Sequence, residues 1–97
     1  MLVLPNPAKD AVNRAKHGWD FGRIGEIFAG PVLLQPDDRP LGYDREGRIR
    51  VTGLIGGRVV RLVYEPVDLG DGELVVEPIS LRDATRREKL QYWELYK

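Results

Sequence analysis

The chain of 97 residues contains no cysteine and only one histidine, His17. The absence of cysteine excludes disulfide bonds, thiolate metal sites and cysteine nucleophiles. With a single imidazole, a zinc site would need carboxylates for nearly all its ligands, so we expect no metal and no other cofactor. The net charge is zero, because 15 basic residues balance 15 acidic ones. This balance argues against an extended nucleic-acid-binding surface.

Long hydrophobic runs are also missing. No apolar stretch approaches the ~18 residues that a membrane-spanning helix needs. Residues 1–4 are too few for a signal peptide and lack its basic start. The sequence therefore predicts a cytoplasmic protein without a membrane partner. Its length and its hydrophobic fraction of 42% suit one compact domain over residues 1–97.

The N-terminal third of the sequence predicts a short strand and two helices. Residues 2–4 form the strand, and Asn6 followed by Pro7 provides the cap and first residue of a helix that ends at Gly18. Helical spacing of small apolar residues predicts a narrow buried face on it, formed by Ala8, Ala11, Val12 and Ala15. A second helix, between Asp20 and Gly30, has an apolar stripe of Phe21, Ile24, Ile27 and Phe28. A polar loop follows over residues 35–44.

From residue 48 onward the pattern becomes that of strands. Residues 49–53 alternate in polarity, Gly56 and Gly57 form a two-residue hairpin turn, and a more apolar strand continues to Tyr64. After a second glycine turn, residues 74–76 and 79–80 complete an antiparallel three-stranded meander. Asp83 can cap a final helix over residues 84–96, whose aromatic side chains cover the sheet or bind a partner. This order predicts an α+β fold.

The first predicted helix carries a group of polar side chains on one flank: Lys9, Asn13, Lys16 and His17. They lie at the border of the predicted buried face, where a side chain can line a cleft. Histidine is the side chain that most readily exchanges a proton near neutral pH. The alternative is an ordinary solvated face in which His17 stabilises the C-terminal end of the helix.

The segment 78–88 carries three arginines. Arg82 follows the predicted last strand, and Arg86 and Arg87 fall in the first turns of the predicted helix, where cations oppose the helix dipole. A bound phosphate would offset this mismatch, because a guanidinium group donates two parallel hydrogen bonds to it. The alternative is an exposed lattice of arginines and carboxylates, with Arg82 paired to a carboxylate. Basic residues outnumber acidic ones near both chain ends, so a local cationic face forms if the ends meet.

Together the two segments resemble the BrnT-type toxins, bacterial ribonucleases of type II toxin–antitoxin systems with a RelE-like fold. The resemblance covers nearly the whole chain and rests on a Pro-Ala-Lys helix start, Asn13, Lys16-His17-Gly18, Phe21, Phe28, Ile79-Ser80-x-Arg82-x-Ala84 and Glu88. It implies an antiparallel sheet of three to four strands. The chain departs from the family pattern at Pro5-Asn6, at Glu77-Pro78 and at Leu81. The last two departures lower the positive charge beside Arg82.

The resemblance also implies a function. The family consists of endoribonucleases that inhibit translation, cleave RNA without a metal and are neutralised by a cognate antitoxin. That antitoxin is a BrnA-like ribbon-helix-helix protein, so operator DNA is contacted only through it. On this hypothesis the catalytic residues are Lys9, His17, Arg82 and Glu88, and the substrate-binding residues are Asn13, Lys16, Ser80 and Arg86. Arg82 binds the phosphate, with help from Arg86 or Lys9, and His17 or Glu88 transfers the proton.

Two other interpretations fit the same sequence. In the first, the protein is a catalytically degenerate toxin that binds the antitoxin and modulates repression of the operon, as the neutral net charge, Glu77 and Leu81 suggest. In the second, the chain is an unrelated α+β domain with no connection to RNA. Growth arrest on expression without the antitoxin would exclude the first interpretation.

Overall fold

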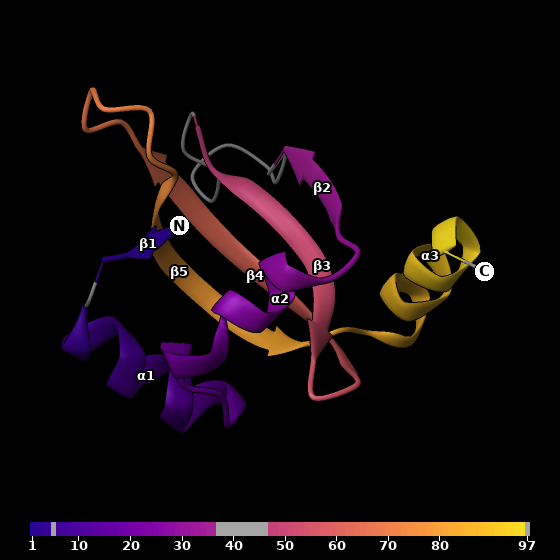
Figure 1. Cartoon of the computed structure of the whole chain (residues 1–97). Coiled ribbons are helices and arrows are strands. Elements are labelled where there is room, and N and C mark those ends of the chain that lie inside the picture. The colour runs from indigo at the N-terminus through magenta and orange to yellow at the C-terminus, as the bar shows by residue number, and fades with distance from the viewer. Residues whose placement is uncertain (5, 37–46, 97) are drawn as a thin grey trace.

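The computed structural model describes residues 1–4, 6–36 and 47–96 (Figure 1). This part of the chain contains, in order, β1 (Leu2–Val3), α1 (Pro7–His17), the 3₁₀ turn η1 (Phe21–Arg23), α2 (Gly25–Ala29), β2 (Leu33–Pro36), β3 (Ile49–Ile55), β4 (Arg58–Val67), β5 (Val75–Asp83) and α3 (Arg86–Tyr96). The predicted α+β fold with a C-terminal helix is confirmed. Within the described ranges, no helix is both long and apolar enough to cross a bilayer.

The five strands form one mixed sheet in the order β1-β5-β4-β3-β2 (Figure 1). Neighbouring strands from β2 to β5 are antiparallel, whereas β1 runs parallel to β5, with Leu2 opposite Val75. The predicted antiparallel sheet of three to four strands was therefore too small. It lacked β2, which includes Gln35 at the start of the predicted loop, and it left β1 unpaired. Residues 37–44 of that loop lie outside the described residues.

β5 passes through Pro78 as one strand, so the predicted interruption there was wrong. Pro78 lies opposite Tyr64 and Ser80 lies opposite Val63, which leaves Ile79 as an extra residue in a β-bulge. A bulge lets a proline remain within a strand because it relaxes the local hydrogen-bonding pattern. It also sets the direction of the Ser80 side chain just beyond it.

The last helix begins later than predicted and has a different cap. Asp83 ends β5, and the cap of α3 is Thr85, whose Oγ1 accepts a hydrogen bond from the Glu88 N–H at 3.2 Å. The Glu88 carboxylate in turn accepts from the Thr85 N–H at 2.8 Å. This reciprocal pair is a capping box, and it fixes the first turn of α3.

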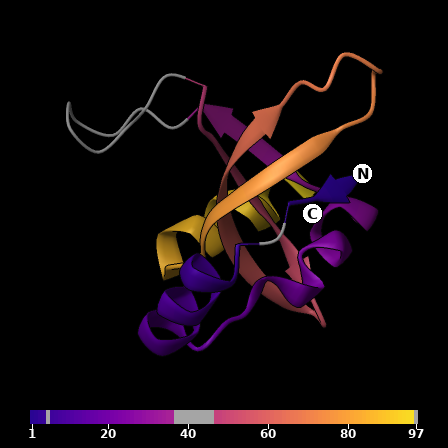
Figure 2. The same ribbon diagram turned by 90° about the vertical axis from the view of Figure 1, so that its left-hand side faces the viewer.

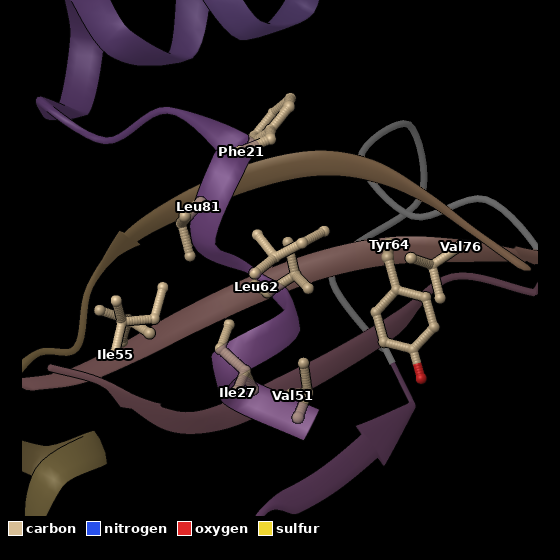
Figure 3. Close-up of a cluster of buried hydrophobic side chains, with 10 residues drawn as sticks. Phe21, Ile27, Val51, Ile55, Leu62, Tyr64, Val76 and Leu81 are labelled. Carbon is tan, nitrogen blue, oxygen red and sulfur yellow. The ribbon is translucent and has the colours of Figure 1, made fainter. Parts of the chain in front are cut away.

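The main core lies between the sheet and the segment formed by η1 and α2 (Figure 3). Phe21, Ile24 and Ile27 are buried as predicted, although a 3₁₀ turn and a short α-helix replace the single predicted helix. α2 packs closely on β3 because residue 53 is glycine. A Cβ atom at Gly53 would lie 2.7 Å from Cγ2 of Ile27.

The strands separate α3 from α1 (Figure 1). α3 covers a smaller cluster around Val59 and Ala84, in which Tyr92 is fully buried and donates a hydrogen bond to the Pro31 carbonyl at 2.7 Å. Four large side chains of this helix stay exposed, namely Leu90, Trp93, Leu95 and Tyr96. The predicted aromatic helix therefore both covers the sheet and presents apolar groups to solvent.

The predicted buried face of α1 is wrong. Its alanines are exposed and Val12 is 65% exposed, whereas Asn13 is buried, with 4% of its surface accessible. Figure 2 shows α1 beside the end of β5 that leads to α3. The helix thus approaches the edge of the sheet through a polar side chain, and its small apolar residues remain exposed.

Candidate functional site

Asn13 joins α1 to the edge of β5. Its amide nitrogen donates to the carbonyls of Trp19 and Leu81, both at 2.8 Å, and its amide oxygen accepts from the Leu81 N–H at 2.9 Å. In the described part of the chain β1 pairs only with Val75 and Val76, so Asn13 takes the place of a neighbouring strand farther along β5. Both amide hydrogens are thereby used, and Asn13 holds the wall of the site in position.

A cavity of about 310 Å³ lies between α1 and β5. Five of the eight predicted site residues line it, namely Lys9, Asn13, Lys16, His17 and Ser80. Ala8, Val12 and Ile79 supply its apolar walls. The structure therefore brings the polar flank of the first predicted helix together with one residue of the distant 78–88 segment.

The ends of α1 are fixed as the sequence predicts. Asn6 caps the N-terminus by accepting a hydrogen bond from the Lys9 N–H at 3.1 Å, and Gly18 ends the helix with a left-handed conformation at φ 76°. His17, half-buried, occupies the last turn beside the cavity. Lys9 Nζ lies 3.6 Å from Glu77 Oε1. The carboxylate of Glu77, one of the residues at which the chain departs from the family pattern, therefore partly neutralises the charge of Lys9.

Among the described residues, Arg82, Arg86 and Glu88 stand outside this lining. Arg82 Nη1 and Nη2 donate to the two oxygens of Glu88 at 2.7 and 2.9 Å, and Arg61 Nη1 lies 2.5 Å from Glu88 Oε2. This network joins α3 to β4 and β5. The alternative expectation, that Arg82 pairs with a carboxylate, is thus met. Arg86 is exposed at the first residue of α3.

The same network controls the charge of Glu88. Burial favours the neutral acid, but hydrogen bonds from Arg82 and Thr85 and the charges of Arg61 and Arg82 outweigh it, and they lower the pKa of Glu88 from 4.5 to about 2. The hydrogen bond to Glu88 raises the pKa of Arg82 above its ordinary value. A carboxylate held in this way is a poor proton acceptor at neutral pH. Of the two predicted proton-transfer groups, His17 is the better suited.

Ser80 connects the cavity to Arg82. Alternate residues of a strand point to the same side, so Ser80 and Arg82 share one face of β5 beyond the bulge. Arg82 keeps 33% of its side chain exposed despite its pair with Glu88. A ligand at Ser80 therefore has cationic side chains of α1 on one side and Arg82 along the strand on the other.

Sequence reasoning missed a second cluster, formed by Trp19, Arg58 and Asp83. Trp19 Nε1 donates to Asp83 Oδ1 at 3.2 Å, and Arg58 Nη2 donates to both Asp83 oxygens at 2.9 and 2.8 Å. Arg58 Cζ lies over the Trp19 ring, 5.2 Å from its centroid. No local spacing signals this cluster, because its members come from three separate segments and Asp83 has the pattern of a helix cap.

Comparison with known proteins gives one family. Residues 6–88 match the family model described as "Ribonuclease toxin, BrnT, of type II toxin-antitoxin system". The matched region contains all eight predicted site residues and every residue that lines the cavity between α1 and β5. No curated protein matches the chain.

Proposed function

Because the chain belongs to the BrnT family of ribonuclease toxins of type II toxin–antitoxin systems, we propose that it cleaves RNA in the cavity between α1 and β5. The convergence of Lys9, Lys16, His17 and Ser80 from two distant segments on one cavity carries this proposal. RNA cleavage requires a proton acceptor, positive charge near the phosphate and groups that orient it. These four side chains supply all three.

The proposed reaction needs no metal. His17 accepts the proton of the ribose 2′-OH, the 2′-oxygen forms a bond to phosphorus, and the bond from phosphorus to the 5′-oxygen breaks. Solvent water protonates the leaving 5′-oxygen, and the products are a 2′,3′-cyclic phosphate and a 5′-hydroxyl end. Lys9 and Lys16 stabilise the additional negative charge of the phosphorane transition state.

The remaining predicted residues have supporting roles. The Ser80 hydroxyl orients the phosphate, and Arg82 binds it, or the next phosphate, from the same face of β5. Glu88 positions Arg82 through their two hydrogen bonds. Arg86 contributes charge where the RNA passes the start of α3, and Asn13 holds α1 in place.

Purified protein and a fluorescent RNA test this assignment. We expect cleavage that persists in EDTA and yields cyclic phosphate ends. His17→Ala should reduce the cleavage rate by about 10²- to 10⁴-fold, the range for loss of a general base. Arg14→Gln is the matched control, because Arg14 is an exposed cation of the same helix outside the cavity lining. Wild-type rates in both the His17→Ala and Arg82→Ala variants would contradict the proposed site.

A type II toxin has a cognate antitoxin. We infer that this partner is a BrnA-like ribbon-helix-helix protein, that it binds the exposed apolar side chains of α3, and that it alone contacts operator DNA. Exposed fractions of 63% at Leu90 and 47% at Trp93 support this docking surface. Free of its antitoxin, the toxin acts on RNA in the cytoplasm and inhibits translation.

A non-catalytic role is the second candidate, and two ion pairs favour it. Glu77 lies against Lys9, and Glu88 occupies both Nη groups of Arg82, so two predicted catalytic cations already have carboxylate partners. In this case the protein binds the antitoxin and modulates repression without cleaving RNA. Induction in the absence of the antitoxin distinguishes the two candidates, because growth arrest supports the ribonuclease and normal growth supports the binding module.

A further inference from the structure

A second cavity, of about 480 Å³, lies on the other side of His17, between the Gly18-Trp19 segment and the hairpin that joins β3 to β4. We propose that this cavity binds the base of the nucleotide next to the cleaved phosphate and prefers bases that carry an exocyclic amino group. This inference rests on the proposed function, since it takes RNA as the ligand and His17 as the point of cleavage.

The two cavities share a wall. His17 lines both of them, and Trp19, Arg58 and Asp83 lie on the far side of the second. An RNA strand whose ribose meets His17 in the first cavity therefore reaches the second with its next nucleotide. The arrangement gives single-stranded RNA a continuous path around the C-terminal end of α1.

Trp19 and Arg58 form a stacking platform in the second cavity. Arg58 covers the Trp19 ring at 5.2 Å from the centroid, and Asp83 fixes its orientation through two hydrogen bonds. The Arg58 side chain is 64% exposed, which leaves its guanidinium group accessible. Unpaired RNA bases stack on both arginine planes and aromatic rings, so a base can extend the existing Trp19–Arg58 stack.

Asp83 gives the platform a means of selecting bases. Between described residues, Oδ1 accepts from Trp19 and Arg58, while Oδ2 accepts only from Arg58. A carboxylate has about four acceptor positions, so one on Oδ2 remains. The amino group of adenine, cytosine or guanine can donate to it. Uracil has no such group and would place a carbonyl oxygen there instead.

Arg23 lines the second cavity and is paired with Glu26, to which it donates hydrogen bonds at 2.6 and 3.1 Å, so the pair adds no net charge there. The Arg23 side chain is 56% exposed and lies close to Gly56 in the turn between β3 and β4. Gly56 has a φ of +57°, and a Cβ atom there would lie 3.0 Å from Arg23 Nη2. Glycine at this position therefore permits both the turn and the close approach of Arg23.

Tryptophan fluorescence tests base binding without cleavage. The chain has two tryptophans, so Trp93→Phe leaves Trp19 as the only reporter and Trp19→Phe is the matched control. We expect saturable quenching by AMP, CMP and GMP in the Trp93→Phe variant, with affinities about threefold or more above that for UMP. The Trp19→Phe control should show no saturable quenching. Equal quenching by all four nucleotides would overturn the amino-group preference. Absence of saturable quenching in the Trp93→Phe variant would overturn the assignment of base binding to this cavity.

Two variants then separate base binding from a structural effect. Arg58→Lys keeps the charge but removes the planar group at an exposed position, and it should lower kcat/KM for an oligonucleotide by about tenfold, the order of one lost stacked base. Asp83→Asn should abolish the difference between CMP and UMP. The proposal would be overturned if Arg58→Lys kept the wild-type kcat/KM and Asp83→Asn kept the wild-type difference between CMP and UMP.

The proposed cleavage and the proposed subsite can fail separately. If the wild-type protein does not cleave RNA but binds nucleotides at Trp19, the subsite stands as a binding site and the ribonuclease assignment fails. If the protein cleaves RNA but Trp19 responds only to the antitoxin, the cleavage assignment stands and the subsite is instead a protein contact, which overturns this inference.

Discussion

Glu88 is the buried carboxylate that links α3 to Arg61 of β4 and Arg82 of β5. Its carboxylate accepts from Arg82 and from the Thr85 N–H, and it lies against Arg61, while only 11% of the side chain is exposed. Burial of one carboxylate is tolerated here because two guanidinium groups and a backbone N–H surround it. The residue that the family resemblance assigns to catalysis thus has a structural task as well.

Stability should consequently fall in acid. The pKa of Glu88 is about 2 in the folded protein and 4.5 ordinarily, so its contribution is complete above pH 4.5 and disappears as the pH falls toward 2. We expect a loss of about 1 to 3 kcal/mol across this window, allowing for solvent screening. Urea unfolding at a series of pH values measures it.

Glu88→Gln provides the comparison, because glutamine keeps the size and an acceptor oxygen but cannot ionise. The difference in unfolding free energy between wild type and this variant should shrink from pH 6 to pH 2.5. A constant difference would show that the two arginines do not stabilise the charge of Glu88.

At the scale of elements, local turn and cap chemistry was predictable from the sequence. Asn6 and Gly18 bound α1, and Gly56 and Gly57 form the hairpin with positive φ angles of 57° and 82°. These features depend on a few adjacent residues. The parallel pairing of β1 with β5 depends on residues more than 70 positions apart, and no local pattern contains it.

The buried face of α1 was mispredicted because it, too, depends on residues far apart in the sequence. The alanine spacing is compatible with burial, but Asn13 makes two hydrogen bonds to Leu81, 68 residues away, and these decide which side faces the sheet. The candidate site was predictable in part, because Lys9, Lys16 and His17 share a flank of one helix. The cluster of Trp19, Arg58 and Asp83 was not, since tertiary packing alone brings it together.

Asn13→Ala should therefore loosen α1 from β5. The substitution leaves the buried Leu81 N–H and carbonyl without their partner, which we expect to lower the free energy of unfolding by about 2 to 4 kcal/mol. Denaturant unfolding measures the loss. Ala15→Ser, at an exposed position of the same helix, should change stability by less than about 0.5 kcal/mol. Equal stability of the two variants would contradict the role of Asn13.

For the whole molecule, zero net charge limits how strongly RNA is attracted. The cations of the cavity, chiefly Lys9 and Lys16, form a small local group rather than an extended surface. We expect log(kcat/KM) for cleavage to fall against log[salt] with a slope of about −1.4 to −2, which corresponds to two or three phosphate contacts on a single strand. Initial rates between 50 and 300 mM KCl measure this slope.

Lys16→Gln should reduce the magnitude of the slope by about 0.7, the contribution of one contact, and Arg14→Gln should leave it unchanged. A wild-type slope steeper than about −2.8 would mean that RNA contacts more cations than the four lysines and arginines that line the two cavities.

The contact between Asn13 and Leu81 also bears on when the protein becomes active during synthesis. The residues of α1, which form one wall of the cavity, are translated early. Ile79 and Ser80, which form the other wall, are translated much later. A nascent chain that ends before residue 81 contains the residues of α1 but no β5 edge for them to bind, and contacts of such high sequence separation form late in folding. Translation through residue 81 thus precedes assembly of the site that is proposed to cut RNA.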